Sequence, residues 1–154
     1  MEEKNYALVG RIIESVQQIE YDLIRGVKYK RLFQLFEKYK NVSPHLFQKV
    51  EEDTTMLAKK MATMTFGELI GIVKKYELLG IDDTDYLESL LSKRNQLVHQ
   101  YFKYNEMNQC SEQMKTNYLT RFLEESLAYS EYLTRLIDEM KTDLNYISSG
   151  KYNC

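Results

Sequence analysis

Residues that interrupt helices are rare in this chain. A single proline and six glycines are spread over 154 residues, and both residue types destabilise the interior of a helix. Between these few interruptions, apolar residues recur at the three- and four-residue spacing of an amphipathic helix. Valine, isoleucine and threonine never gather in the alternating run that would indicate a strand. The sequence therefore predicts an all-α fold, a bundle of four to five helices.

The first two helices are delimited by local signals. The first is expected over 5–39, with a kink or a break at Gly26, because glycine costs about 1 kcal/mol in a helix interior. Ser43 and Pro44 are typical of an N-cap and of a first helical position, so a second helix is expected over 44–62. Its candidate core residues are Leu46, Phe47, Val50, Met56, Leu57 and Met61.

The next two helices have their own start and stop signals. Thr65 and Glu68 have the spacing of a capping box. We expect Gly80 to close the helix that they open, as its C′ residue. Asp82 or Asp83 is then expected to cap a fourth helix, which should continue to about Phe102.

The last helix is expected to begin at Ser111 and to end near Tyr146. No linker divides the chain, so we expect one helical domain over 1–147 and a frayed tail over 148–154. No run approaches 18 apolar residues, which predicts the absence of a membrane span. The first residues are acidic and lack the layout of a signal peptide, so we expect the chain to remain in the cytoplasm.

Composition excludes several kinds of site. The formal net charge of −2 excludes binding of nucleic acid by bulk charge alone, so such binding requires a local basic patch. Cys110 and Cys154 are too few and too far apart for a zinc site, and we expect free thiols. The acidic run at 82–85 lacks the glycine and the distal glutamate of an EF-hand. We therefore expect neither a metal ion nor another cofactor.

The fourth helix carries the candidate chemistry. Arg94 falls near the centre of its apolar stripe, where an arginine is costly unless it is paired. Asn95 and His99 share a face at the edge of that stripe. Together they supply a phosphate clamp, an amide donor and a proton carrier that titrates near neutrality. Taken singly, each also fits a structural role: Arg94 can pair with a carboxylate on the next helix, and His99 can simply be hydrogen-bonded.

The segment 90–102, LLSKRNQLVHQYF, resembles the signature of the HEPN family (higher eukaryotes and prokaryotes nucleotide-binding). The family motif is an arginine, a polar residue, three further residues and a histidine. Arg94, Asn95 and His99 match it with four residues between the arginine and the histidine. Some members also carry a tyrosine two residues after the histidine, which corresponds to Tyr101. The rest of the chain shows only a compatible organisation.

The resemblance implies an HEPN-like dimeric bundle that acts as a metal-independent endoribonuclease of the toxin–antitoxin or phage-defence type. In a homodimer, two copies of the motif would form one composite cleft, in which a ribose 2′-OH of RNA attacks the adjacent phosphate. His99 would act as general base or acid, Arg94 would stabilise charge in the transition state, and Asn95 would orient His99 or the phosphate. In members paired with a nucleotidyltransferase antitoxin the motif tyrosine is adenylylated, which corresponds to Tyr101.

Further candidates for RNA binding are basic side chains. Lys28 and Arg31 lie in a basic stretch at 25–40 that is interleaved with aromatic residues, as in a surface that contacts phosphates and stacks bases. Lys93 directly precedes the motif. The alternative for the stretch is a solvated charged face with core aromatic residues behind it. The alternatives to a ribonuclease are a non-catalytic HEPN module that binds a nucleotide or a partner, and a helical interaction protein in which the motif is a coincidence.

Overall fold

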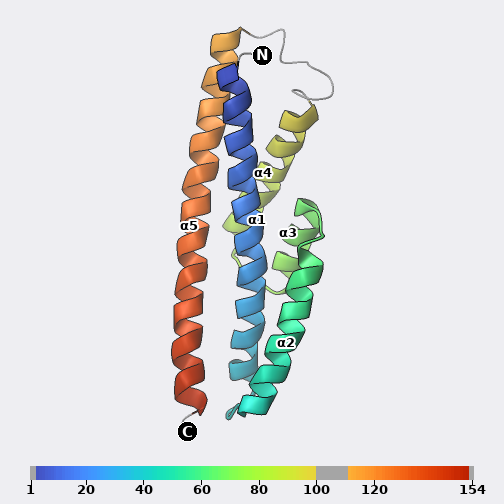
Figure 1. The fold of residues 1–154 in the computed structure, drawn as a ribbon, viewed down its shortest axis with the longest axis vertical. Coiled ribbons are helices and arrows are strands. Elements are labelled where there is room, and N and C mark those ends of the chain that lie inside the picture. The colour runs from blue at the N-terminus through green and yellow to red at the C-terminus, as the bar shows by residue number, and fades with distance from the viewer. Residues whose placement is uncertain (1–2, 100–110, 153–154) are drawn as a thin grey trace.

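The computed structural model describes residues 3–99 and 111–152 and places them in five helices, with no strand in these two ranges (Figure 1). The all-α prediction is confirmed. In chain order the helices are α1 (Glu3–Lys38), α2 (Pro44–Met61), α3 (Phe66–Lys75), α4 (Ile81–Val98) and α5 (Glu112–Tyr152). Within the described part of the chain, no helix combines the length and the apolar character that crossing a membrane requires.

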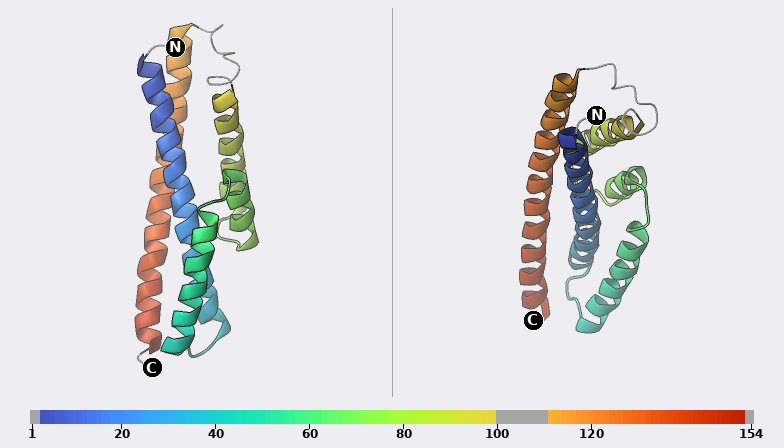
Figure 2. Two further views of the ribbon diagram at one scale, coloured as in Figure 1. Left: turned by 45° about the vertical axis from the view of Figure 1, so that its right-hand side comes forward. Right: turned by 45° about the horizontal axis from the view of Figure 1, so that its top comes forward.

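The two longest helices, α1 and α5, run side by side in the same direction (Figures 1 and 2). The Thr116 hydroxyl donates to Asn5 Oδ1 at 2.8 Å, and the hydroxyls of Ser15 and Ser126 lie 2.7 Å apart. Both pairs are separated by 111 positions in the sequence, which is the signature of parallel helices in one register. Because buried polar groups require their partners, these contacts select that register over its neighbours.

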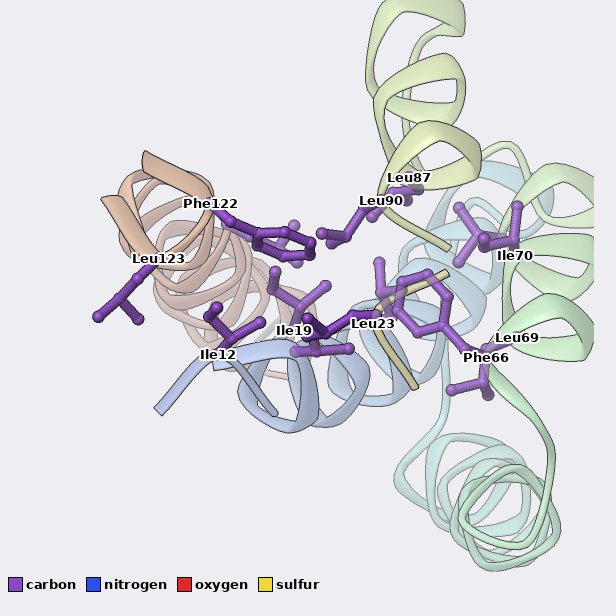
Figure 3. Packing of buried hydrophobic residues seen from close by; sticks show 14 of the residues in the cluster. Ile12, Ile19, Leu23, Phe66, Leu69, Ile70, Leu87, Leu90, Phe122 and Leu123 are labelled. Atoms are coloured by element: carbon purple, nitrogen blue, oxygen red, sulfur yellow. The ribbon is translucent and has the colours of Figure 1, made fainter. Parts of the chain in front are cut away.

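The main core is built around α1, which lies between α5 on one side and α2 and α3 on the other (Figure 1). Side chains from all five helices contribute to it, and Figure 3 labels members from α1, α3, α4 and α5. Fully burying one such leucine or isoleucine stabilises the fold by about 1.5–3 kcal/mol. Large fully buried members are Ile12, Ile19, Leu23, Met61, Leu69, Leu87, Leu97, Leu119, Leu133 and Ile137. A smaller cluster of Leu32, Leu35, Phe36, Val42 and Leu144 joins the far ends of α1 and α5 to the start of α2.

Three predicted helix starts are confirmed. Ser43 caps α2 through a side-chain oxygen that accepts a backbone N–H of the first turn at 3.1 Å. Thr65 and Glu68 form both bonds of the capping box at the start of α3. The Ser111 hydroxyl accepts a backbone N–H of the first turn of α5 at 3.2 Å. Each bond satisfies a donor that has no partner inside the helix.

Gly26 does not break α1, contrary to the sequence-based expectation. The helix continues through this position to Lys38. A Cβ atom at Gly26 would lie 2.7 Å from Ile137 Cδ1 and 2.7 Å from Leu78 Cδ2. The glycine therefore allows α5 and the turn between α3 and α4 to approach α1 closely, and this closeness is the physical reason for its place in a helix interior.

The prediction that Gly80 closes α3 is wrong. The left-handed residue after this helix is Glu77, with φ 52°. The N–H groups of Leu78 and Glu77 donate to the carbonyls of Val73 and Lys74, both at 3.1 Å. This is the Schellman pattern, with a glutamate in the position that glycine usually occupies. The helix therefore ends three residues earlier than a glycine signal indicates.

The start of α4 also differs from the expectation. Gly80 has an extended backbone and is itself the N-cap of α4, with no side-chain capping bond. Asp82 and Asp83 lie inside the first turn, where their negative charges interact favourably with the positive end of the helix dipole. The prediction that one of them is the cap is therefore wrong.

Two further expectations fail at the periphery of the bundle. Met56 is 70% exposed, because it lies on the side of α2 that faces away from α1, so it is not a core residue. α5 continues to Tyr152 rather than ending near Tyr146. Residues 148–152 of the expected frayed tail are therefore helical.

Candidate functional site

The candidate site lies on the last turns of α4. Leu90 and Leu97 are buried against the rest of the bundle, and Arg94 between them is half-buried, at the stripe position that the wheel predicts. Asn95 and His99 are exposed. The helix thus presents one guanidinium toward the bundle and an amide and an imidazole toward solvent.

Arg94 faces Glu20 of α1. Burial raises the pKa of the Glu20 carboxyl above its ordinary 4.5, and the positive charge of Arg94 acts on the same carboxyl in the opposite direction. Both side chains are half-buried. Among the described residues, no hydrogen bond or ion pair is formed by either of them. The two opposite charges are therefore close enough to interact but are not joined in a salt bridge.

Arg94 and His99 point in different directions from α4. They are five positions apart, which on a regular helix corresponds to about 140° around the axis and roughly 7 Å along it. Asn95 lies about 40° from His99 by the same geometry and shares its side of the helix. The guanidinium therefore starts from the half-buried side of α4 and the imidazole from its exposed side.

Lys93 lies toward α5. Its ammonium forms an ion pair with Glu125 at 3.4 Å, and both side chains are about half exposed. On the helical wheel it is about 160° from Asn95. The structure therefore places Lys93 on the opposite side of α4 from the exposed part of the motif.

Lys28 and Arg31 lie at another level of the molecule. The Arg31 guanidinium is 5.9 Å from the centre of the Tyr76 ring at the end of α3. Along α1, Arg31 is roughly 16 Å and Lys28 roughly 12 Å beyond the level of Glu20, at 1.5 Å per residue. Neither side chain is brought together with Arg94 or His99 in one chain.

Sequence reasoning missed a tyrosine cluster that holds α4 on α5. The rings of Tyr86 and Tyr129 stack with their centres 4.3 Å apart. The Tyr129 hydroxyl donates to Asp83 Oδ1 at 3.1 Å, and burial, followed by the Asp83 charge, raises the pKa of Tyr129 strongly. The signal that could have found the cluster is a set of aromatic residues on α5 at helical spacings of four, seven and three positions: Tyr118, Phe122, Tyr129 and Tyr132.

Several predicted residues lie outside the described ranges. Tyr101, Cys110 and Cys154 are among them, so the proposed modification site has no structural description. Across residues 3–99 and 111–152, no group of three histidine, cysteine, aspartate or glutamate side chains is arranged to hold a metal ion.

Comparison of the chain with protein-family models, with curated proteins and with solved structures finds no match.

Proposed function

We propose that this chain is a metal-independent endoribonuclease of the HEPN type, a cytoplasmic toxin or phage-defence effector that cleaves RNA. The observation that carries the proposal is the state of Arg94. It is half-buried in an apolar stripe, yet no ion pair or hydrogen bond to another described residue uses its donors. A planar guanidinium with its donors available fits the geometry of a phosphate.

The chemistry follows from the residue types. A ribose 2′-OH attacks the adjacent phosphate, Arg94 stabilises the added negative charge, and His99 transfers a proton as general base or acid. Asn95 orients His99 or the phosphate from the same side of α4. DNA lacks the 2′-OH and is not cut.

The divergence of Arg94 and His99 on α4 supports a composite cleft. Because about 140° separates the two side chains in one chain, a second copy would supply a guanidinium and an imidazole from the other side of the substrate. A two-fold homodimer with both α4 helices near the axis meets this requirement. A nucleotidyltransferase antitoxin that modifies Tyr101 at the cleft is the further partner that the motif favours.

The test is cleavage of a labelled RNA by purified protein in EDTA. His99→Ala and Arg94→Ala should each lower the rate at least 100-fold, which is the lower range for loss of a proton-transfer group or of an electrostatic stabiliser. Arg135→Ala, at an exposed position of α5, is the matched control and should cleave like the parent. Equal rates for the parent and for both motif variants would refute the nuclease assignment.

The second candidate is a non-catalytic module that binds a nucleotide through Arg94. The observation that favours it is the same divergence, because a guanidinium that projects away from His99 can bind a phosphate without the imidazole taking part. This function predicts nucleotide binding that Arg94→Ala abolishes and His99→Ala leaves intact, with no RNA cleavage. Calorimetry with a nucleoside monophosphate, beside the cleavage assay, separates it from the ribonuclease. Absence of both binding and cleavage would favour a helical interaction protein.

A further inference from the structure

Glu20 is the acidic group that α1 presents to the candidate site. Its neighbour in the sequence, Ile19, is fully buried in the core, and the Glu20 side chain is half-buried beside it, facing Arg94. No hydrogen bond or ion pair joins it to another described residue. A carboxylate in this state has lost contacts with water that no protein group replaces. Such groups are concentrated at functional sites.

We propose that Glu20 is the general base of the ribonuclease reaction and that His99 is the general acid. This inference rests on the proposed function. Attack by a 2′-OH requires one group that accepts the proton of the nucleophile and another that donates a proton to the leaving 5′-oxygen. Each copy of the motif offers one histidine, and Glu20 of the same chain, beside Arg94, is the second proton carrier. Arg94, which faces Glu20, would hold the phosphate beside the carboxylate.

Every proton and bond in the proposed cleavage step is accounted for. A Glu20 carboxylate oxygen accepts the 2′-OH proton while the 2′-oxygen forms its bond to phosphorus. The bond from phosphorus to the 5′-oxygen breaks, and that oxygen takes a proton from the His99 imidazolium. The products are a 2′,3′-cyclic phosphate and a 5′-hydroxyl, and no water is consumed. Proton exchange with solvent then returns Glu20 and His99 to their starting states.

The surroundings of Glu20 suit this role. Burial raises the pKa of its carboxyl, and a general base is most effective when its pKa lies near the working pH. Arg94 of α4 is the charged group that acts on it, and among the described residues no charged group of α2, α3 or α5 does so. The guanidinium therefore favours the ionised form that a base requires.

The first experiment measures kcat/KM for RNA cleavage in EDTA as a function of pH. Glu20→Gln should lower it at least 100-fold and remove the limb that rises with pH, because that limb reports ionisation of the base. Glu20→Asp keeps a carboxylate and should keep the limb. Glu14→Gln, on the exposed side of α1, is the matched control and should behave like the parent. Circular dichroism verifies that each variant is folded.

A second substrate separates the two proton carriers. An RNA whose leaving 5′-oxygen is replaced by sulfur needs no general acid, because a thiolate leaves unprotonated. On this substrate His99→Ala should recover to within about 10-fold of the parent, whereas Glu20→Gln should remain at least 100-fold slower. The comparison uses the folded full chain throughout.

The outcomes distinguish this inference from the function on which it rests. If the parent cleaves RNA and Glu20→Gln matches Glu14→Gln, the base assignment is overturned and the ribonuclease stands. A slower Glu20→Gln variant with the pH profile of the parent would show that Glu20 only holds Arg94, and this also overturns the assignment. If the parent itself cleaves no RNA, the proposed function is refuted and the role of Glu20 with it.

Discussion

Alanine at Gly26 and alanine at Gly10 should change the stability of the fold in opposite directions. Both positions lie inside α1, where replacing glycine by alanine gains about 1 kcal/mol of helix propensity. At Gly10 the new Cβ meets nothing within 4 Å. Gly10→Ala should therefore raise the free energy of unfolding by about the full 1 kcal/mol.

At Gly26 the same gain is opposed by a collision. The new Cβ would lie 2.7 Å from side-chain atoms of both Ile137 and Leu78. Leu78 is only half-buried and can move, but Ile137 is fully buried and has less freedom. Overpacking of this kind costs typically 1–3 kcal/mol, so Gly26→Ala should lower the net stability by roughly 0–2 kcal/mol. The two variants should then differ by roughly 1–3 kcal/mol.

Urea unfolding followed by circular dichroism at 222 nm measures this difference. In thermal unfolding this difference in stability corresponds to roughly 2–12 °C between the melting temperatures of the two variants. For a chain of this size, 1 kcal/mol shifts the melting temperature by about 2–4 °C. Ile137→Val removes one of the colliding atoms, so it should cost less in the Gly26→Ala background than in the parent. Equal stabilisation by alanine at Gly26 and at Gly10 would refute the close approach of α5 to α1.

Three further predictions concern assembly, modification and pH. Light scattering at micromolar concentration should give the mass of a dimer, and a monomer would contradict the composite cleft. Tyr101→Phe should retain RNA cleavage yet escape neutralisation by a co-expressed nucleotidyltransferase antitoxin, because the hydroxyl that accepts the nucleotide is gone; neutralisation of both proteins alike, or adenylylation at another residue by intact mass, would contradict this. Because the pKa of Tyr129 is raised above its ordinary 10, its neutral form stabilises the fold below pH 10, and this contribution is lost as the pH rises further. Tyr129→Phe should cost about 1 kcal/mol at pH 8 and flatten the alkaline decline of stability in urea titrations, whereas an unchanged decline would exclude Tyr129 as its source.

Local signals predicted the starts of helices well and one helix end poorly. Ser43 and Thr65 bond backbone groups three residues away, so the relevant chemistry is contained in a few neighbouring positions. The end of α3 instead depends on Glu77, which adopts a left-handed conformation that glycine reaches at lower cost. A propensity argument therefore favours Gly80, although the backbone bonds of the Schellman pattern are formed three residues earlier.

Helical periodicity predicted that Arg94 lies within the apolar stripe of α4. It did not predict that Glu20 of α1 faces Arg94. Periodicity identifies the buried side of a helix and contains no information about which helix covers it. Glu20 is distant from the motif in sequence and lacks a neighbouring pattern of its own. The role of Gly26 was missed for the same reason, since the atoms of Ile137 that require it belong to the far end of the chain. The sequence alone therefore did not predict which residues from distant parts of the chain lie next to each other in the fold.

The parallel pairing of α1 with α5 has a consequence for how the chain folds during synthesis. Partners such as Ser15 and Ser126 are 111 positions apart, and at about 5–20 residues per second the second partner follows the first by about 5–20 s. During that interval the face of α1 that α5 covers in the finished fold remains open to other chains. Contacts of such long range slow folding, and exposed apolar surface at this stage promotes aggregation. Of the helices in this bundle, α1 is thus synthesised first, and its face toward α5 is covered only after α5 has been made.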